Sequence, residues 1–357
     1  MVVLEHAALT YSEKVGASST SGVFALGDLG VKLFFCISGY IIYKSAGGLE
    51  PGPQSASFFA RRRLIRIAPL YWCVTLIYAA KLGLQGALPD GRELAWSLLF
   101  IPYANSTGLM RPVLGQGWTL NFEMFFYLFL GLSLFLAKHL RLVAVCGLLL
   151  LLMGARHVGL VVPGEGSGFG PALYLLASEN LLFFMAGMCI AALEKTGATA
   201  LVALRWETSM LISATLILVF VAAGPAPFGA SFIAELALCA SCVAVCVMAR
   251  SEGEQGRTRR CLLWSGDASY TTYLTHGFVM GPAARIVGAT GLEVSPWMFC
   301  LCMLIVCTGV GMVVYRLVEH PLMVWMNAHW CSSRPARAHQ VGAEGSVPGA
   351  TSATTSV

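Results

Sequence analysis

The sequence predicts an all-α protein, a polytopic membrane helical bundle of about ten spans in which the first span is truncated at its N-terminal end. Three observations predict this fold. Hydrophobic residues make up 57% of the 357-residue chain and charged residues only 11%, whereas soluble domains carry about 25% charged residues. The mean hydropathy is +0.73. Apolar runs of roughly 20 residues, the length that crosses a bilayer, recur along most of the chain.

Nine apolar runs are predicted to be membrane spans because they are long, nearly free of charge and separated by polar segments. In chain order they are Val23–Tyr43, Leu64–Lys81, Trp118–Ala137, Leu142–Val162, Ala172–Leu193, Met210–Ala223, Phe232–Met248, Ser269–Val287 and Trp297–Val318.

Three further segments are expected to behave differently. The run from Met1 to Leu9 is too short to span, and it lacks the basic region and cleavage site of a signal peptide. We expect it to be the outer half of a helix that begins upstream of Met1. Arg92–Tyr103 is amphipathic and is expected to lie at the membrane interface. Residues 1–327 should form one membrane domain, and residues 328–357, rich in Ser, Ala and Gly, a disordered cytoplasmic tail.

The lysines and arginines orient the predicted spans. When Arg61–Arg66 is placed inside, sixteen of the 23 basic residues fall in cytoplasmic loops, six in outer loops, and Lys32 within a span. Cytoplasmic loops carry such an excess of positive charge, so the C-terminus is predicted to be cytoplasmic. Because the basic residues are dispersed at the ends of apolar runs, they do not predict a nucleic-acid-binding surface.

The twelve cysteines do not predict a metal site. Most lie inside apolar runs, where a thiol packs as a small hydrophobe. Cys239, Cys242 and Cys246 share one helical face, but no histidine accompanies them. We therefore expect no bound metal.

A cluster of four arginines precedes the span that begins at Leu64: Arg61, Arg62, Arg63 and Arg66. Guanidinium groups match phosphate oxygens in geometry and charge, so the cluster suits a phosphorylated ligand on the cytoplasmic side. The same cluster also serves as a topology anchor, which is common in membrane proteins. The residues alone leave both interpretations open.

Ionisable residues at membrane depth are costly and often functional. His6 lies in the first apolar run, and Glu123 lies five residues into its span. For both we favour a functional role because polar or aromatic groups surround them. For Glu179 and Glu235 we favour a structural hydrogen bond between helices.

Other polar groups share helical faces with each other. Asp28 and Lys32 are four residues apart and can form an ion pair. Tyr127 lies one turn from Glu123, and Asn121 is on a neighbouring face. Three-residue spacing places a further set on one face: Tyr270, Tyr273 and His276.

These residue types favour a group transfer. A histidine in a membrane cavity suits a general base because its pKa lies near working pH, and the arginine cluster suits a nucleotide-bearing donor. From the residues alone, a transporter is equally compatible.

Five motifs, spread over nearly the whole chain, resemble the integral-membrane acyltransferase family 3, and within it the branch of bacterial exopolysaccharide O-acetyltransferases related to succinoglycan acetylation. They are Gly27–Tyr40, Arg62–Trp72, Pro112–Tyr127, Gly266–His276 and Glu319–Leu322. The segment Pro112–Tyr127 is the most specific of them.

The resemblance implies that residues 1–327 form a membrane acyltransferase domain of about ten spans in the bacterial inner membrane. Family members move an acyl group, usually acetyl from cytoplasmic acetyl-coenzyme A, to a sugar hydroxyl of an exported or lipid-linked glycan. The expected partners are therefore acetyl-coenzyme A as co-substrate, a glycan acceptor and membrane lipid, with no bound cofactor. The alternative is a flippase or transporter of a lipid-linked glycan without acyl transfer.

The implied mechanism gives each candidate a role. The catalytic histidine of the family matches His6, which deprotonates the sugar hydroxyl or briefly carries the acetyl group, and Glu123 acts with it. The donor phosphates are expected near Arg63 and Arg66, helped by Arg61 and Arg62. The remaining candidates position His6 or the sugar: Asp28, Lys32, Trp118, Asn121, Tyr127, Tyr273 and His276.

Two departures from the family pattern concern the same region. Position 32, commonly acidic in the family, is Lys32, and we expect Asp28 to compensate by pairing with it. An arginine ten residues before the catalytic histidine belongs to the pattern, and here that position would precede Met1.

Overall fold

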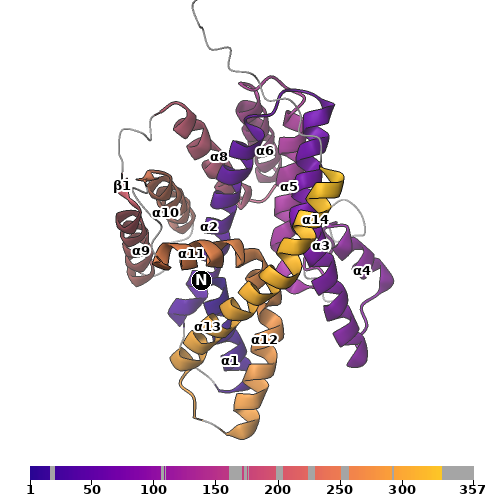
Figure 1. The fold of residues 1–357 in the computed structure, drawn as a ribbon, viewed down its shortest axis with the longest axis vertical. Helices are drawn as coiled ribbons and strands as arrows, with labels where there is room; N and C mark the ends of the chain where they lie inside the picture. Colours follow the sequence, from indigo (N-terminus) through magenta and orange to yellow (C-terminus); the bar gives the residue numbers. More distant parts are fainter. Residues whose placement is uncertain are drawn as a thin grey trace, which may run out of the picture.

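The computed structural model is an α-helical bundle (Figure 1). It describes residues 1–16, 21–105, 108, 110–160, 171–172, 175, 177–197, 204–223, 230–250, 257–291 and 293–331. The helices are α1 (Val2–Lys14), α2 (Ser21–Ala46), α3 (Pro53–Leu84), α4 (Gly91–Leu98), α5 (Trp118–Ser133), α6 (Arg141–His157), α8 (Leu181–Lys195), α9 (Trp206–Ala223), α10 (Ala230–Val247), α11 (Arg257–Asp267), α12 (Ser269–Thr290), α13 (Pro296–Val314) and α14 (His320–Trp330).

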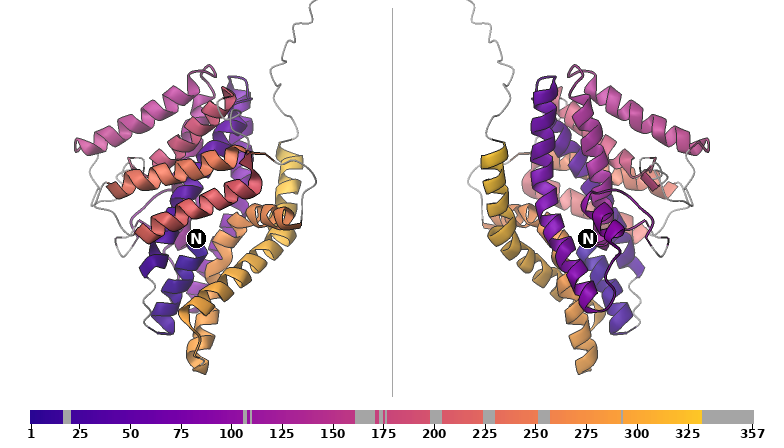
Figure 2. Two further views of the ribbon diagram at one scale, coloured as in Figure 1. Left: turned by 90° about the vertical axis from the view of Figure 1, so that its left-hand side faces the viewer. Right: turned by 90° about the vertical axis from the view of Figure 1, so that its right-hand side faces the viewer.

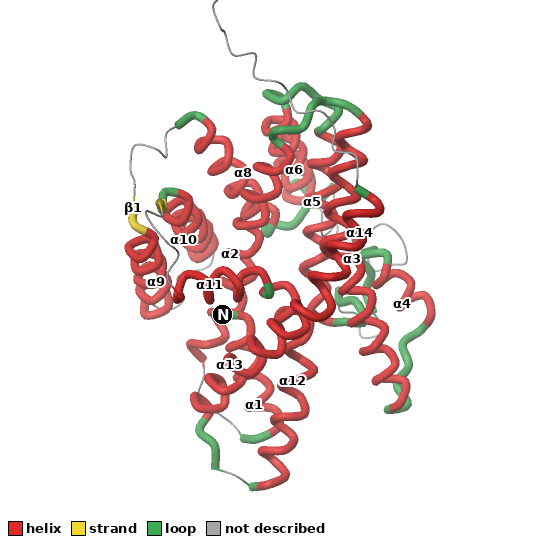
Figure 3. The backbone as a smooth tube through the Cα atoms, viewed as in Figure 1, coloured by secondary structure: helices red, strands yellow, loops and turns green. Residues whose placement is uncertain are grey.

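The predicted all-α class is confirmed. Figure 3 shows that helices account for most of the described chain, with short loops between them. A short 3₁₀ turn, Gly115–Gly117, precedes α5. Within the described residues, the strands are the two-residue pieces β1 (Leu204–Arg205) and β2 (Ala249–Arg250), which pair in parallel.

Each predicted span contains a helix, but three of these helices are shorter than predicted: α5 ends at Ser133, α6 ends at His157, and α8 begins only at Leu181. Among the described residues, four helical stretches are both long and apolar enough to cross a membrane: Leu26–Ala46, Pro53–Leu84, Trp206–Ala223 and Pro296–Trp330. Helices of this length and composition are typical of a membrane protein. The total of about ten spans remains a prediction.

The predicted interfacial segment and the predicted tail also differ from the structure in their boundaries. The amphipathic piece predicted over Arg92–Tyr103 is helical only over Gly91–Leu98, and Phe100 then adopts a positive φ of 57°, which ends the helix. The disordered tail was predicted from residue 328, but α14 continues to Trp330. The rest of the predicted tail, residues 332–357, lies outside the described residues.

The span predicted to end at Val318 continues into α14 through a π turn, Tyr315–Glu319. Pro321 follows this turn and has no N–H, so the carbonyl four residues earlier loses its usual donor. A single π turn accommodates such a defect without ending the helix, and π turns are frequent at functional sites. The helix therefore carries Glu319 at the junction.

Helix α2 is the central element (Figures 1 and 2). It contacts α1 on one side and α8 and α10 on another. Helices α1, α12 and α13 pack together at the lower end of the molecule, and α9 packs against α10 on its flank. The chain begins near the middle of the molecule, at the start of α1 (Figure 1).

Two glycines explain how closely α2 approaches α8. A Cβ atom at Gly39 of α2 would lie 2.1 Å from the carbonyl oxygen of Phe184, and one at Gly187 of α8 would lie 2.0 Å from that of Cys36. Both clashes are with backbone, so any larger residue would force the helices apart. Small residues at such crossings are the usual basis of helix association in membranes.

Candidate active site

The catalytic histidine expected from the sequence contacts a second histidine. The Nδ1 atom of His6, in α1, lies 2.7 Å from the Nε2 atom of His276, in α12. The two rings are tilted by 45° with centroids 4.8 Å apart. His276 is only 1% exposed. The fold thus joins residues 270 positions apart into one polar pair, here called the histidine pair.

The hydrogen bonds around the histidine pair assign its tautomers. The Nδ1 atom of His276 lies 3.3 Å from the carbonyl oxygen of Thr272. A carbonyl oxygen only accepts, so this Nδ1 carries the hydrogen, and a neutral His276 then accepts at Nε2. His6 must therefore donate from Nδ1, which leaves its Nε2 atom with a free lone pair. A neutral imidazole held in this way is arranged as a proton acceptor.

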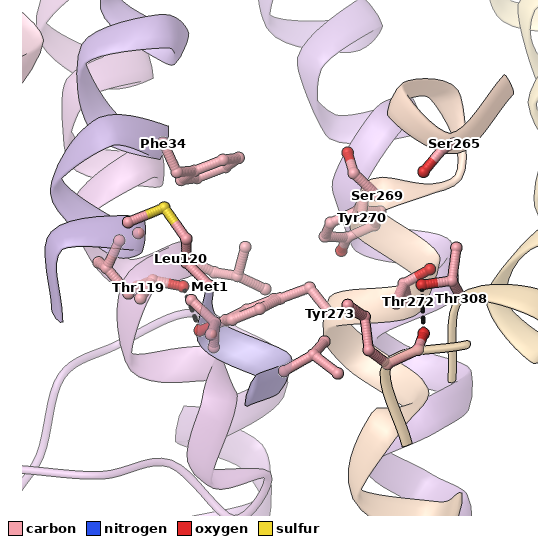
Figure 4. A pocket seen from close by; sticks show the side chains of 15 residues that line it. Met1, Phe34, Thr119, Leu120, Ser265, Ser269, Tyr270, Thr272, Tyr273 and Thr308 are labelled. Atoms are coloured by element: carbon pink, nitrogen blue, oxygen red, sulfur yellow. Dashed lines mark hydrogen bonds between the residues drawn. The ribbon is translucent and has the colours of Figure 1, made fainter. Parts of the chain in front are cut away.

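A cavity of about 250 Å³ lies about one helical turn from the histidine pair and is here called the histidine cavity, although neither imidazole ring lines it. The first residues of α1, one turn before His6, form one wall, and α12 residues up to Tyr273, about one turn before His276, form another. Figure 4 shows Tyr270, Thr272 and Tyr273 of α12 facing Phe34 of α2 and Thr119 of α5 across this space. The lining is mainly apolar, with hydroxyl groups on the α12 side.

Tyr273 is fixed at the edge of the histidine cavity. Its hydroxyl donates to the carbonyl oxygen of Gln116 at 2.8 Å and lies 3.0 Å from Oγ1 of Thr119. Its ring centroid is 6.1 Å from that of His276. The predicted common face of Tyr270, Tyr273 and His276 is thus present, and it faces the cavity and His6.

The arginine cluster lines a different cavity, the arginine pocket, of about 630 Å³. Arg62, Arg63 and Arg66 contribute from α3, Lys44 from the end of α2, and His320 from α14. Arg61 does not line this pocket. Its guanidinium contacts the hydroxyl of Ser57 and the carbonyl oxygen of Trp330. The structure therefore brings three of the four predicted arginines together.

Arg66 connects the two cavities. Its guanidinium pairs with the carboxylate of Glu319, which is 2% exposed and also accepts from the hydroxyl of Thr271. The same guanidinium lies 5.7 Å from the ring centroid of Tyr270. Tyr270 lines the histidine cavity, and its hydroxyl donates to the carbonyl oxygen of Ile67 at 2.8 Å. Contacts of Arg66 thus link the arginine pocket, through Tyr270, to the lining of the histidine cavity.

Glu123 belongs with the arginines rather than with His6. It is 5% exposed and accepts a hydrogen bond from Tyr127, one turn along α5. Arg63 and Arg66 are close enough to interact with its charge. Arg63 also packs over the rings of Phe59 and Tyr127, at 5.5 and 5.7 Å. The residue that contacts the imidazole of His6 is His276.

The remaining predicted site residues fall into two groups. Asp28 and Lys32 form the predicted ion pair, at 2.5 Å, but Lys32 lines a third cavity, on the α8 and α10 side of α2. Trp118 packs edge-on against Phe35 and Phe122 in the core, and Asn121 is buried beside it in α5. These two α5 residues support the wall that carries Thr119.

Sequence reasoning missed two charged groups at the site. Glu319 was noted only as part of a motif, although an acidic residue directly after an apolar run and before His-Pro is itself a signal. Arg111, in the segment before α5, interacts electrostatically with His6. No spacing rule links Arg111 to His6, because the two are 105 positions apart and belong to different elements.

An apolar helical bundle of this kind is typical of a membrane protein, and its histidine pair and arginine pocket are groups that suit proton transfer and phosphate binding. The comparisons with known proteins specify the class. Residues 1–316 match the family model described as "Acyltransferase domain", and the chain belongs to this acyltransferase family. It is similar to the exopolysaccharide production protein ExoZ of Rhizobium meliloti (strain 1021), with 32% identity over 317 residues, 86% of this chain and 93% of the relative. No solved structure matches the chain significantly.

Proposed function

We propose that this acyltransferase is a membrane O-acetyltransferase. It moves an acetyl group from acetyl-coenzyme A to a sugar hydroxyl of an exopolysaccharide or a lipid-linked glycan, in the bacterial inner membrane with its C-terminus in the cytoplasm. The observation that carries the proposal is the free Nε2 atom of His6, whose ring is oriented by the contact of its Nδ1 with His276 and lies about one helical turn from a cavity. Membership of an acyltransferase family disfavours a transporter without acyl transfer.

The arginine pocket suits the nucleotide end of the donor. Arg62 and Arg63 line it, and neither forms an ion pair with a carboxylate among the described contacts. The Nε atom of Arg63 is buried without a hydrogen-bond partner, and a phosphate oxygen would supply one. Arg66 is already paired with Glu319, so we assign it to the passage between the cavities rather than to the phosphates alone.

The transfer proceeds in the histidine cavity. The Nε2 atom of His6 takes the proton of the sugar hydroxyl while the sugar oxygen attacks the thioester carbonyl carbon. The carbon–sulfur bond then breaks, and the coenzyme A sulfur takes the proton from His6. The products are an O-acetylated sugar and coenzyme A with a free thiol, and His6 returns to its starting form. His276 keeps the proton of His6 on Nδ1 throughout.

The test is acetyl transfer by the purified full chain in lipid nanodiscs. Acetyl-coenzyme A labelled in the acetyl group is mixed with oligosaccharides released from the exopolysaccharide of the producing strain. We expect labelled O-acetyl esters on sugar, identified by proton NMR, and one free thiol per ester. If label never reaches sugar, and if deletion of the gene leaves the acetyl content of the polymer unchanged, the proposal is wrong.

A further inference from the structure

The third cavity, of about 660 Å³, has a lining that the acyl-transfer mechanism does not use. Lys32 of α2 lines it together with Arg156 and His157 at the end of α6, Glu179 just before α8, and Phe232 and Glu235 in α10. It is here called the α10 cavity. Its volume is within the range of small-molecule binding sites.

Helix α2 separates the α10 cavity from the histidine cavity. Val31 and Phe34 line the histidine cavity, whereas Lys32 lines the α10 cavity. Successive residues of a helix point about 100° apart, so the two cavities flank α2 at the same height. Lys44, in the arginine pocket, is twelve residues further along α2, or about 18 Å at 1.5 Å per residue. The α10 cavity is therefore level with the reaction centre and remote from the nucleotide end.

The polar groups of the α10 cavity are held in place. The ammonium group of Lys32 contacts carboxylate oxygens of Asp28 and Glu235, each at 2.5 Å. The other carboxylate oxygen of Glu235 accepts from the hydroxyl of Ser231 at 3.1 Å. The Lys32 and Glu235 side chains are only 12% and 16% exposed. Salt bridges of this kind keep both donors and acceptors in fixed positions while cancelling most of the charge.

An aromatic ring completes the α10 cavity. Phe232 lines it and is itself held edge-on against Phe183, with centroids 5.5 Å apart. A sugar presents hydroxyls that both donate and accept, and an apolar C–H face that packs on a ring. A lining of balanced charge, with donors and acceptors beside an aromatic face, suits this chemistry better than it suits an anion, because Glu179 and Glu235 would repel one.

We propose that the α10 cavity binds sugar units of the glycan acceptor other than the one that is acetylated. This inference rests on the proposed function, since it assumes a glycan acceptor. The reacting sugar occupies the histidine cavity, and sugars further along the same chain, which passes around the end of α2 rather than through it, contact Glu235 and Phe232. Affinity for the acceptor then depends on its length. A free oligosaccharide and a lipid-linked one carry the same hydroxyl chemistry, and both are used as probes.

The experiment measures the acceptor Michaelis constant for oligosaccharides of one, two, four and eight sugars, free and lipid-linked, with the full chain in nanodiscs. The variants are Glu235→Gln, which leaves Lys32 its pair with Asp28, and Phe232→Leu, which changes no charge. Glu207→Gln is the matched control, because Glu207 is an exposed carboxylate paired with Arg205 and lies outside the three cavities. Saturation-transfer NMR measures binding of the eight-sugar probe without acetyl-coenzyme A.

We expect both variants to raise the Michaelis constant about tenfold for long acceptors, as loss of one charge-assisted hydrogen bond or aromatic contact does, and to leave the single sugar unchanged. A response to the lipid-linked series alone assigns the cavity to the lipid-linked acceptor. Equal changes at all lengths, or wild-type values throughout, would overturn the proposal. The NMR experiment separates the two proposals. If the eight-sugar probe binds but no acetyl group is transferred, the proposed function is refuted and the binding role of the α10 cavity is kept. If acetyl is transferred and both variants have the wild-type Michaelis constant, the proposed function is kept and the role of the α10 cavity is refuted.

Discussion

The histidine pair and the arginine pocket are built on opposite principles. The histidine pair is two rings joined by one hydrogen bond, and no carboxylate contacts either ring among the described hydrogen bonds and ion pairs. The arginine pocket, in contrast, has internal counter-charges: Arg66 is paired with Glu319, and Glu123 lies within electrostatic reach of Arg63. A group that must gain and lose a proton needs a neutral resting state, whereas a group that holds phosphate needs a permanent charge that is already compensated before the ligand arrives.

The largest expected effect comes from removing the free lone pair of His6. His6→Ala should lower the rate of acetyl transfer by about 10²–10⁴-fold, the usual contribution of a general base, with little change in the Michaelis constant for acetyl-coenzyme A. The measurement is steady-state transfer in nanodiscs. His329→Gln is the control, because His329 is an exposed histidine in α14 whose ring contacts a backbone carbonyl four residues earlier. Transfer at the wild-type rate by His6→Ala would show that the histidine pair is not the reaction centre.

The second prediction tests whether His276 acts by fixing the tautomer and orientation of the His6 ring. His276→Leu removes the acceptor that keeps the proton on Nδ1 of His6, and should lower the rate about 10–100-fold, as loss of a histidine-orienting partner does elsewhere. His276→Gln offers an amide oxygen and should restore part of the rate. A tautomer effect predicts this order of the two variants, whereas a purely steric role of His276 predicts that both are equally slow.

Substitutions in the arginine pocket should change the Michaelis constant for the donor rather than the maximal rate. Arg63→Ala should raise it about tenfold, because one charge-assisted contact to phosphate is lost, while the maximal rate changes less. Arg61→Ala is the matched control from the same cluster, since Arg61 does not line the pocket. Equal effects of the two variants would indicate a general surface-charge effect rather than a phosphate site.

Substitution of Glu319 is expected to lower the donor Michaelis constant, whereas Arg63→Ala raises it, and the change is expected to be smaller. Glu319→Gln removes the charge that competes with an anionic donor for Arg66, while an amide can still accept from Thr271. We expect the donor Michaelis constant to fall a few-fold at low salt, because freed guanidinium charge attracts phosphate. A rise instead would mean that Glu319 positions Arg66 for the donor rather than competing with it. Thermal unfolding in detergent checks that the variant is folded.

The smallest effect is expected at Asp28. Its side chain is 59% exposed, and Lys32 keeps Glu235 as a partner when Asp28 is removed. Asp28→Asn should therefore change transfer less than about twofold, since exposed ion pairs contribute little. A large loss would show that Asp28 itself contacts a substrate.

Much of this molecule could be predicted from local patterns. Apolar runs gave the helices, four-residue spacing gave the Asp28–Lys32 pair, and one-turn spacing gave the contact of Tyr127 with Glu123. Contacts between residues on different helices could not be predicted, because a single sequence does not show which helices pack against each other. The expected role of Glu123 beside His6 came from motif membership, and the structure places His276 there.

The end of α14 shows the same limit. The apolar run ends at Val318, before the polar residues Glu319 and His320, yet a π turn lets the helix continue to Trp330. That continuation carries His320 to the arginine pocket, and the turn itself carries Glu319 to Arg66. The end of an apolar run marks where the membrane-embedded part stops, so it does not show that the helix itself continues into polar residues.

The glycine crossing of Gly39 and Gly187 has a mechanical consequence. Backbone in direct contact with backbone leaves no rotamer to change and no gap for a lipid chain, so α2 and α8 must travel as one rigid body. A helix movement that lets the thioester enter or the ester leave is therefore expected in helices that contact α2 through side chains. Helix α1 is one of these. The hinge of this enzyme is therefore expected on the His6 side of α2, where the chemistry takes place.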